Sequence, residues 1–469
     1  MLWFASACAL ALTMSALHHY TAAGALAARA TLALGFLVIA AWLGGELAAR
    51  RRVPRVTGFL LVGLCVGPAW LNLVRADELA ALQFLADAGV ALFALVAGSE
   101  LAGAARAPDR IGLARVAGVA IGLPFAAVTL IMLTVSPWFP LTVHESFGNA
   151  VGVALVLGAL AAVASPVLSV ITAEDTPVTG PLARAVIGVT ALQDVALLLV
   201  LSLVLLVAQP LARPGALNFA VAGGALLRWA GSLAAGGVLG ILVVQAGVFS
   251  DGGAKRGTGT TLDTGVTPLV LTLGCLLALL GHALDVEPLL VALAAGFTSK
   301  QRGLDLGATV GRVLQGGGGG GGGGRSQPIT AACFGIVGAG LRFDALADLW
   351  PWVVLLVCLR AAALRHGVRW VAERAGAGVT PALAPEGWLG LISQSGTALG
   401  LAPLVRRAFP ALGVSLEALI LATVAVHEVA GPVCFRQALT RGSRKEAAHV
   451  GEGADAVGAI VGVTGSGVR

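Results

Sequence analysis

Residues 182–208 read LARAVIGVTALQDVALLLVLSLVLLVA, an apolar run with a single acidic side chain, Asp194, one residue from its midpoint. A helix needs about 20 apolar residues to cross the hydrocarbon core of a bilayer, so this run predicts a transmembrane helix with a carboxyl group near its centre. A charged side chain at that depth costs about 2.5–3.5 kcal/mol on insertion scales. We therefore expect Asp194 to have a function. The alternative is an inert carboxylic acid with a purely structural role in helix–helix contact.

The composition of the whole chain agrees with this run. Of the 469 residues, 57% are hydrophobic and only 12% are charged, whereas a soluble domain has roughly 25% charged residues. This excludes soluble enzymes, nucleic-acid binders and disordered proteins. The six cysteines lie in apolar runs without CxxC spacing, which is typical of packing residues rather than of disulfides or a metal site. We expect an all-α integral membrane protein that is not an enzyme and binds no cofactor.

Further apolar runs predict about thirteen transmembrane helices. Their expected ranges are 29–50, 54–72, 82–104, 111–134, 149–172, 180–208, 218–248, 266–282, 286–301, 328–346, 350–372, 386–408 and 414–438. Residues 1–28 form an apolar segment ahead of them, which is either a weak signal or an extra helix, because it is short and lacks a basic start. Residues 439–469 are expected to form a short polar tail.

The distribution of basic residues predicts the orientation. The loop with Arg50 and Arg55 is assigned to the cytoplasm, and the sides alternate from there. The cytoplasmic side then holds 21 of the 30 Lys and Arg residues, Arg302 and Arg374 among them, and the other side holds seven, including Arg228. Because positive charges favour cytoplasmic loops, we expect a multi-pass protein of the cell (inner) membrane with a cytoplasmic C-terminus. The nine-glycine run 316–324 is then a cytoplasmic linker. The net charge of +6 then needs no partner beyond the cytoplasmic lipid surface, and we expect no nucleic-acid partner.

Two predicted spans contain clusters that break helices. The span 149–172 includes Ser165 and Pro166, and the span 386–408 includes a polar run. That run consists of Ser393, Gln394, Ser395, Gly396 and Thr397. Unwound backbone is tolerated in a membrane only where it lines a cavity or is buried in protein. Interruptions at corresponding places in two halves of a chain point to a transport site, and these spans are fifth and twelfth in order.

Other polar side chains inside the spans have less specific interpretations. Thr190 lies four residues before Asp194 on the same helical face and is expected to donate a hydrogen bond to its carboxylate. His427 and Glu428 lie in the last span, where structural glue is the favoured interpretation of Glu428. Arg342 either neutralises a carboxylate or extends to the membrane interface. We expect no metal site beyond that of a transported monovalent cation.

Six short stretches, taken in order, resemble motifs of the monovalent cation:proton antiporter superfamily. They are Pro54–Gly58 followed by Gly63 and Gly67-Pro68, then Phe93–Leu101, Ala164–Pro166, Leu192–Asp194, Gly338–Asp344 and Gln394–Gly396. The resemblance covers about residues 29–438 and is greatest to the second subfamily, which includes the glutathione-gated potassium efflux antiporters. The nucleotide-binding domain of that branch has no counterpart here, so regulation by nucleotide or glutathione is not expected.

The resemblance implies two inverted repeats, at about 54–208 and 266–438, joined by a linking helix at about 218–248. It also implies two crossed broken helices and a second domain that forms a homodimer. In this arrangement Asp194 binds the ion and the proton, and it is supported by Gln193, Thr190 and the residues of the two breaks.

The same resemblance implies a secondary active transporter that exchanges K⁺ or Na⁺ for a proton. Gln193 stands where sodium-specific electrogenic relatives have a second acid, so a single carboxylate carries one proton or one cation in turn, and we expect electroneutral exchange. Two alternatives stay open: a sodium-coupled organic anion carrier on a similar fold, and a transport-inactive membrane regulator.

The predicted orientation can be tested by cysteine accessibility. In a variant without its native cysteines, we expect Gly320→Cys in the glycine run to react with a membrane-impermeant maleimide only after the cells are permeabilised. Gly215→Cys, in a loop predicted on the opposite side, should react in intact cells. The reverse pattern would contradict the orientation.

Overall fold

The structure is a computed structural model, and it describes residues 12–15, 26–106, 110–176, 180–212, 219–246, 266–284, 286–314, 328–341, 346–374, 386–394, 405, 409 and 412–464. Within these residues the regular structure is helical throughout, without a strand. Seven stretches of the described residues are long and apolar enough to cross a membrane, one of them the interrupted stretch Phe147–Asp175, and three shorter apolar helices accompany them. The all-α membrane fold is therefore confirmed, while the count of thirteen spans stays a prediction.

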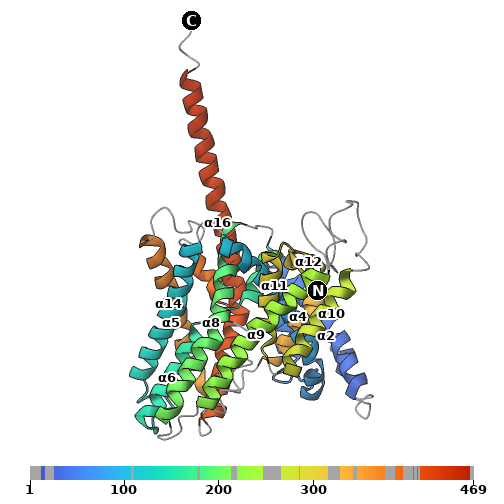
Figure 1. Cartoon of the computed structure of the whole chain (residues 1–469), viewed down its shortest axis with the longest axis vertical. Helices are drawn as coiled ribbons and strands as arrows, with labels where there is room; N and C mark the ends of the chain where they lie inside the picture. The colour runs from blue at the N-terminus through green and yellow to red at the C-terminus, as the bar shows by residue number, and fades with distance from the viewer. Residues whose placement is uncertain are drawn as a thin grey trace.

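The helices form two bundles with a slanting helix between them (Figure 1). The first, named here the broken-helix bundle, contains α5 (Arg110–Thr134), α6 (Phe147–Ala161), α7 (Pro166–Asp175), α8 (Pro181–Ala212), α14 (Leu346–Arg374), the 3-10 helix η3 (Gly387–Leu391) and α16 (Gly413–Thr464). The second bundle contains α2 (Leu26–Arg50), α3 (Arg55–Val66), α4 (Ala76–Arg106), α10 (Val266–Leu284), α11 (Pro288–Gln301), α12 (Leu306–Leu314) and α13 (Pro328–Gly340). The slanting helix α9 (Phe219–Ala246) contacts both α8 and α11.

Glycines bring the helices of the second bundle into backbone contact. Gly98 of α4 packs on the carbonyl of Leu293 in α11, and Gly296 of α11 packs on the carbonyl of Leu95 in α4. Gly63 of α3 meets the backbone of α13 in the same way, and a Cβ at any of these glycines would collide with main-chain atoms. Because lipid provides no hydrophobic drive between helices, such close approach supplies the van der Waals contact that joins them.

The span expected at 149–172 is interrupted, as the sequence predicts. Helix α6 ends at Ala161, residues 162–165 are not helical, and α7 begins at Pro166. Proline lacks the amide hydrogen that a helix interior needs, but it suits the first helical turn. The hydroxyl of Ser165 caps the new helix by accepting from the amide of Leu168 at 3.2 Å, which satisfies one of the free amides at its start.

The second predicted break is also present. The 3-10 helix η3 ends at Leu391, and residues 392–394 are not helical. Ser395, Gly396 and Thr397 lie outside the described residues, so their conformation stays a prediction.

Three elements differ from the sequence prediction. The helix expected at 54–72 is shorter, because α3 ends at Val66 and Gly67 adopts extended backbone before Pro68. Helix α12 was not predicted, since its nine residues are too few for a span. The segment 439–469, expected as a polar tail, continues α16 as far as Thr464 and leaves the bundle (Figure 1).

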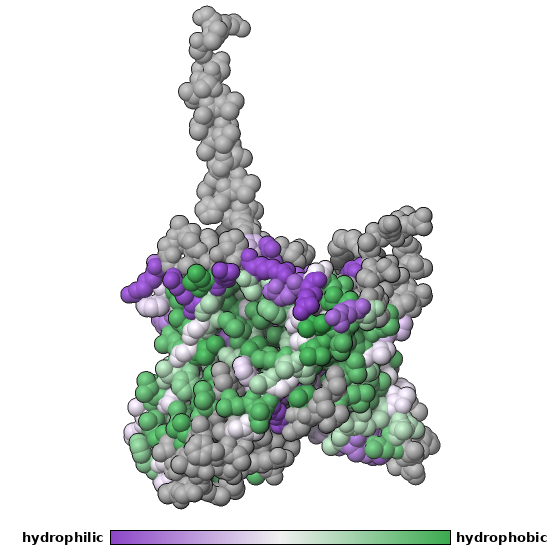
Figure 2. Space-filling model, viewed as in Figure 1, coloured by the Kyte–Doolittle hydropathy of each residue, from purple (hydrophilic) through white to green (hydrophobic). Residues whose placement is uncertain are grey.

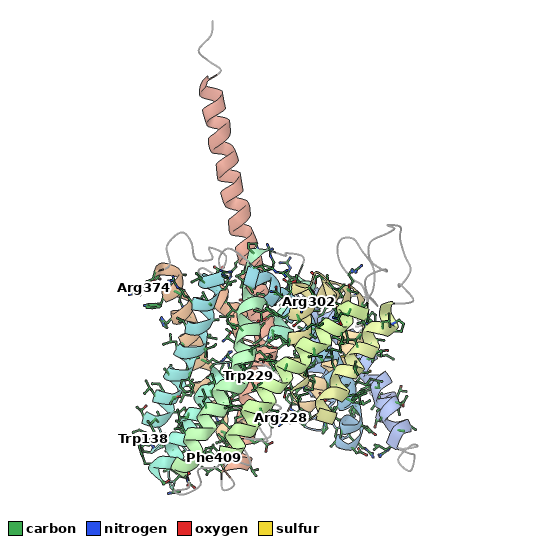
Figure 3. The ribbon with its side chains drawn as sticks, viewed as in Figure 1. Trp138, Arg228, Trp229, Arg302, Arg374 and Phe409 are labelled. Atoms are coloured by element: carbon green, nitrogen blue, oxygen red, sulfur yellow. The ribbon has the colours of Figure 1, made fainter. Side chains whose placement is uncertain are left out.

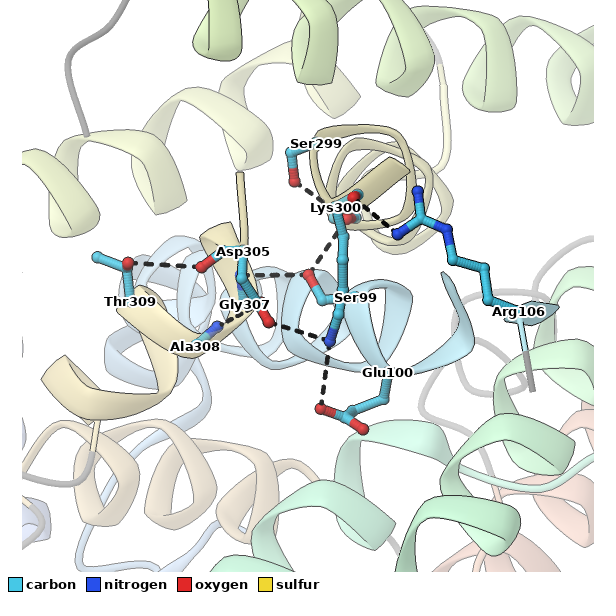
Figure 4. A network of polar contacts seen from close by, with 10 residues as sticks. Ser99, Glu100, Arg106, Ser299, Lys300, Asp305, Gly307, Ala308 and Thr309 are labelled. Carbon is cyan, nitrogen blue, oxygen red and sulfur yellow. Dashed lines mark hydrogen bonds and ion pairs between the residues drawn. The ribbon is translucent and has the colours of Figure 1, made fainter. Parts of the chain in front are cut away.

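Helix α12 is anchored to the end of α4 by a polar network (Figure 4). The Ser99 hydroxyl donates to the carbonyl of Gly296 at 3.1 Å and accepts from the amide of Gly307 at 3.1 Å. Beside it, Nζ of Lys300 lies 3.9 Å from the carboxylate of Glu100. Ser99 therefore holds α12 against the end of α4, and Glu100 beside it pairs with Lys300 of α11.

The molecule has a polar rim at the end where α16 leaves it. Figure 2 shows hydrophilic residues along this rim and an apolar surface below it. Arg302 and Arg374 lie at the same end (Figure 3). Both were assigned to the cytoplasmic side from the sequence, so the fold gathers them on one face as that assignment requires.

An ion pair links the two bundles. Arg55 begins α3, and its Nη1 lies 2.7 Å from Oδ1 of Asp175, the last residue of α7. Its backbone amide donates to Oδ2 of the same carboxylate at 2.7 Å. Only 2% of the Asp175 side chain is exposed, so this contact is a closed link between a broken helix and the second bundle.

The glycine contacts can be tested by adding one methyl group. We expect Gly98→Ala to lower the free energy of unfolding by about 1–3 kcal/mol, because the new Cβ forces α4 and α11 apart. The control is Gly118→Ala in α5, where a Cβ meets nothing within 4 Å; it should leave stability unchanged or raise it. Thermal unfolding in detergent measures both, and equal effects would contradict the packing argument.

Candidate functional site

The two unwound segments cross at the centre of the broken-helix bundle. The amide of Ser165 donates to the carbonyl of Ser393 at 3.0 Å. Both serines are about 2% exposed, so water does not compete for this bond. The two predicted breaks therefore meet in one crossing, as the resemblance implies.

The side chain of Arg360 in α14 joins the two breaks. It donates to the carbonyls of Ala161 at 2.9 Å and Val163 at 2.5 Å, both at the first break. It also donates to the carbonyls of Leu391 at 3.0 Å and Ile392 at 2.5 Å, both at the second. The last carbonyls of a helix have no amide partner and carry its negative dipole end. The guanidinium, which is 1% exposed, thus supplies both hydrogen bonds and a compensating charge.

Two glutamines strengthen the crossing from either side. Nε2 of Gln394 donates to the carbonyl of Leu160 at 2.6 Å. Nε2 of Gln193 donates to the carbonyls of Ala162 at 2.9 Å and Ala120 at 3.3 Å. Helix α8 is therefore fixed to the first break by the residue that precedes Asp194.

Asp194 is buried at the side of α8 that meets α9. It is 2% exposed, and the carbonyl of the next residue, Val195, accepts from Nε1 of Trp229 at 2.8 Å. Trp229 lies beside Arg228 in the middle part of α9 (Figure 3). The acid therefore lies between the crossing, through Gln193, and the slanting helix.

One charged residue from another part of the fold, Glu287, acts on this acid, and two further charges act on Glu287 in turn. Glu287, just before α11, interacts electrostatically with Asp194, with Arg228 of α9 and with Asp87 of α4. The position of Glu287 is fixed by Ser232, whose hydroxyl accepts from the Glu287 amide at 2.9 Å and donates to the Arg228 carbonyl at 2.6 Å. We name Asp87, Asp194, Arg228 and Glu287 the charge cluster. It spans the boundary between the two bundles.

Thr190 makes a different contact from the expected one. Its hydroxyl donates to the carbonyl of Ile187 at 3.1 Å, within its own helix. A threonine hydroxyl has a single hydrogen to donate, so the predicted donation to Asp194 is wrong for this structure.

His427 and Glu428 are buried in α16, at 1% and 3% exposure. Nδ1 of His427 lies 2.9 Å from the carbonyl of Thr423. Within the described residues, Nε2 of His427 and Oε2 of Glu428 have no hydrogen-bond partner. Arg342 lies outside the described residues, so its predicted role in balancing charge stays a prediction.

Sequence reasoning missed Arg360 and most of the charge cluster. Arg360 was visible as a basic residue near the middle of the span 350–372, and an intramembrane charge is a signal for a role. Arg228 was assigned to the non-cytoplasmic loops, yet it lies within α9. Glu287 and Asp87 gave no sequence signal, because both lie near the ends of predicted spans, where a solvated acid is common.

Comparison with known proteins identifies relatives of this fold. The family model described as "Sodium/hydrogen exchanger, transmembrane" matches residues 34–435. The "Iron transporter MagA" of Paramagnetospirillum magneticum is 30% identical over 162 residues, which are 34% of this chain and 34% of MagA. The chain thus aligns with only about a third of that curated relative.

Two solved structures of the sodium proton antiporter MjNhaP1 from Methanocaldococcus jannaschii have a similar fold. The structure at pH 8 has a TM-score of 0.55 at 13% identity, over 89% of this chain and 97% of that one. The electron microscopy structure has a TM-score of 0.56 at 15% identity, over 88% and 97%. At these identities the likeness establishes the fold.

The importance of the arginine can be tested by replacing it with a side chain that lacks donors. We expect Arg360→Met to lower the free energy of unfolding by about 3–5 kcal/mol, because four buried carbonyls lose a charged partner. Arg369→Met, at an exposed position of the same helix, is the control and should change it by less than about 0.5 kcal/mol. Thermal unfolding distinguishes the two, and a similar small effect of both would show that the crossing is stable without Arg360.

Proposed function

The chain belongs to the sodium/hydrogen exchanger family of transmembrane proteins, and from that premise we propose that it exchanges one monovalent cation for one proton at Asp194. The observation that carries the proposal is the position of this acid. It is buried in α8, directly after a glutamine that is bonded to the first helix break. Unwound backbone and a buried carboxylate side by side are the two ingredients of an ion site inside a membrane.

The exchange rests on competition for a single charge. A proton and a monovalent cation each neutralise the Asp194 carboxylate, and both cannot be bound there together. An ionised, empty carboxylate is costly to move through an apolar interface, whereas either loaded form is neutral. Only loaded forms then cross, which couples the flux of one ion to that of the other and makes the exchange electroneutral.

The charge cluster supports a cation rather than an anion as the cargo. This cluster contains three acids, Asp194, Glu287 and Asp87, against one basic residue, Arg228. Arg360 is buried and already donates to four carbonyls, so it does not present a free positive charge to an organic anion. This favours antiport over the alternative of a sodium-coupled anion carrier, and the buried acid favours it over a transport-inactive regulator.

Access to each side in turn requires relative motion of the two bundles. Asp194 and both breaks belong to the broken-helix bundle, whereas Glu287 and Asp87 lie on the second bundle. Rocking of the first against the second carries the site past these residues. The Arg55–Asp175 ion pair joins the bundles at loops predicted to be cytoplasmic, so it must open when the site faces that side. We further propose a homodimer formed by the second bundle, in the inner membrane, with a cytoplasmic C-terminus.

The cation itself is a separate part of the proposal. The family description and MjNhaP1 both name sodium, and the sequence resemblance includes potassium antiporters, so Na⁺ and K⁺ are the proposed cargoes. The relative MagA is named for iron, which makes Fe²⁺ a useful comparison ion in the same assay.

Removal of the central acid should abolish exchange. In proteoliposomes with an internal pH dye, we expect Na⁺ or K⁺ added outside to enter in exchange for protons and so to alkalinise the lumen with the wild type. Asp194→Asn should respond no more than protein-free liposomes do. The matched control is Glu428→Gln, which neutralises another buried acid of the same bundle and should retain exchange. Equal responses of wild type and Asp194→Asn would contradict the proposal, as would a response to Fe²⁺ alone.

Neutralisation of Glu287 should weaken the site without destroying it. At alkaline pH, where few protons compete, we expect Glu287→Gln to raise the apparent KM for the cation by about tenfold, equivalent to about 1.4 kcal/mol. The loss of a nearby negative charge weakens attraction to cation and proton alike, so the pH optimum should also move to lower pH. Glu373→Gln, at an exposed acid of α14, is the control. An unchanged KM and pH optimum in Glu287→Gln would remove Glu287 from the site.

A further inference from the structure

A small cavity lies behind the crossing, lined by residues of α6, α14, α16 and the second break. The space open to the centre of a water molecule is about 20 Å³, and about 10–15 Å³ suffices for one water. Its lining is mostly apolar, with polar groups from Arg360, Gln394 and His427. None of the residues assigned above to the charge cluster lines it.

Two buried hydrogen-bond acceptors at this cavity have no donor. Gln394 uses Nε2 to donate to Leu160, which leaves its Oε1 as an acceptor, and that atom has no partner among the described residues. Nδ1 of His427 faces a carbonyl, that of Thr423, so Nδ1 carries the hydrogen and Nε2 of the neutral ring is an acceptor. Nε2 is likewise buried without a partner. An unsatisfied buried polar atom costs about 1–3 kcal/mol.

One donor of Arg360, which lines the cavity, has no acceptor in the part of the chain that the structure describes. A guanidinium has five N–H groups, and Arg360 uses Nε, both hydrogens of Nη2 and one hydrogen of Nη1 on its four carbonyls. One hydrogen of Nη1 remains. The cavity therefore offers two acceptors and one donor around a space of single-molecule size.

We infer that this cavity is a binding site for one structural water molecule. The water donates to Nε2 of His427 and to Oε1 of Gln394, and it accepts from Nη1 of Arg360. These are three hydrogen bonds, the usual number for a buried water. A metal cation does not fit the same set, because it cannot accept from the guanidinium N–H and would be repelled by that charge. The water thereby connects α16 to the crossing.

The most direct test is a structure of the full chain in lipid nanodiscs at a resolution that shows other buried waters. We expect one density peak within hydrogen-bonding distance of His427 Nε2, Gln394 Oε1 and Arg360 Nη1. In His427→Phe, whose ring fills the space, the peak should be absent. In the control Thr423→Val it should persist, because Thr423 holds the histidine through its main-chain carbonyl, and its hydroxyl donates elsewhere, to Leu419.

Nitrogen-15 NMR of the histidines tests the same site without resolving the water. The resonance that disappears in His427→Phe should belong to a neutral ring with a protonated Nδ1 and an unprotonated, hydrogen-bonded Nε2. A dry cavity in a structure that shows other interior waters would overturn the inference. So would a protonated Nε2, or a direct bond from Arg360 or Gln394 to the ring.

Discussion

The end of a helix inside a membrane leaves carbonyl groups without amide partners, and this constraint governs the centre of the molecule. Two broken helices cross, and the carbonyls at both breaks accept from one buried guanidinium, that of Arg360. Neither part is tolerable alone. The arginine would be an isolated charge in an apolar interior, and the carbonyls would be unsatisfied. Together, the negative dipole ends of two helices and one positive charge neutralise each other.

This pairing determines what is left for Asp194. The positive charge of Arg360 is already engaged by backbone carbonyls. The negative charge of the Asp194 carboxylate can therefore be neutralised by a proton or a cation. Gln193 holds α8 to the first break through Ala162, which keeps the acid beside unwound backbone. On its other side Trp229 of α9 donates to the carbonyl of Val195, and Glu287 of the second bundle interacts electrostatically with the acid. The acid is thus held firmly within the broken-helix bundle and interacts with charge on the second bundle. This arrangement suits a rocking motion of the broken-helix bundle against the second.

Local signals made part of this arrangement predictable from the sequence. Asp194 is an acid in an apolar run, and Ser165-Pro166 combines a cap with a residue that cannot continue a helix; both are properties of a few adjacent residues. Arg360 was not predictable in its role, because its partners are carbonyls about 30 and 200 residues away. The charge cluster depends on how the two bundles meet. The Thr190 hydroxyl donates to a carbonyl in its own helix, that of Ile187, instead of to Asp194. Features that depend on a few adjacent residues could be predicted from the sequence, whereas the pairing of polar groups from distant segments could not.

The central claim is that a single carboxylate carries one proton or one cation in turn, so no net charge moves. The reversal point of exchange tests it most directly. In proteoliposomes with opposed cation and pH gradients, one-for-one exchange stops when the cation ratio across the membrane equals the proton ratio, and an imposed voltage leaves that point unchanged. A null point that moves with voltage would show that net charge is transported and that a second carboxylate, or a different stoichiometry, is at work.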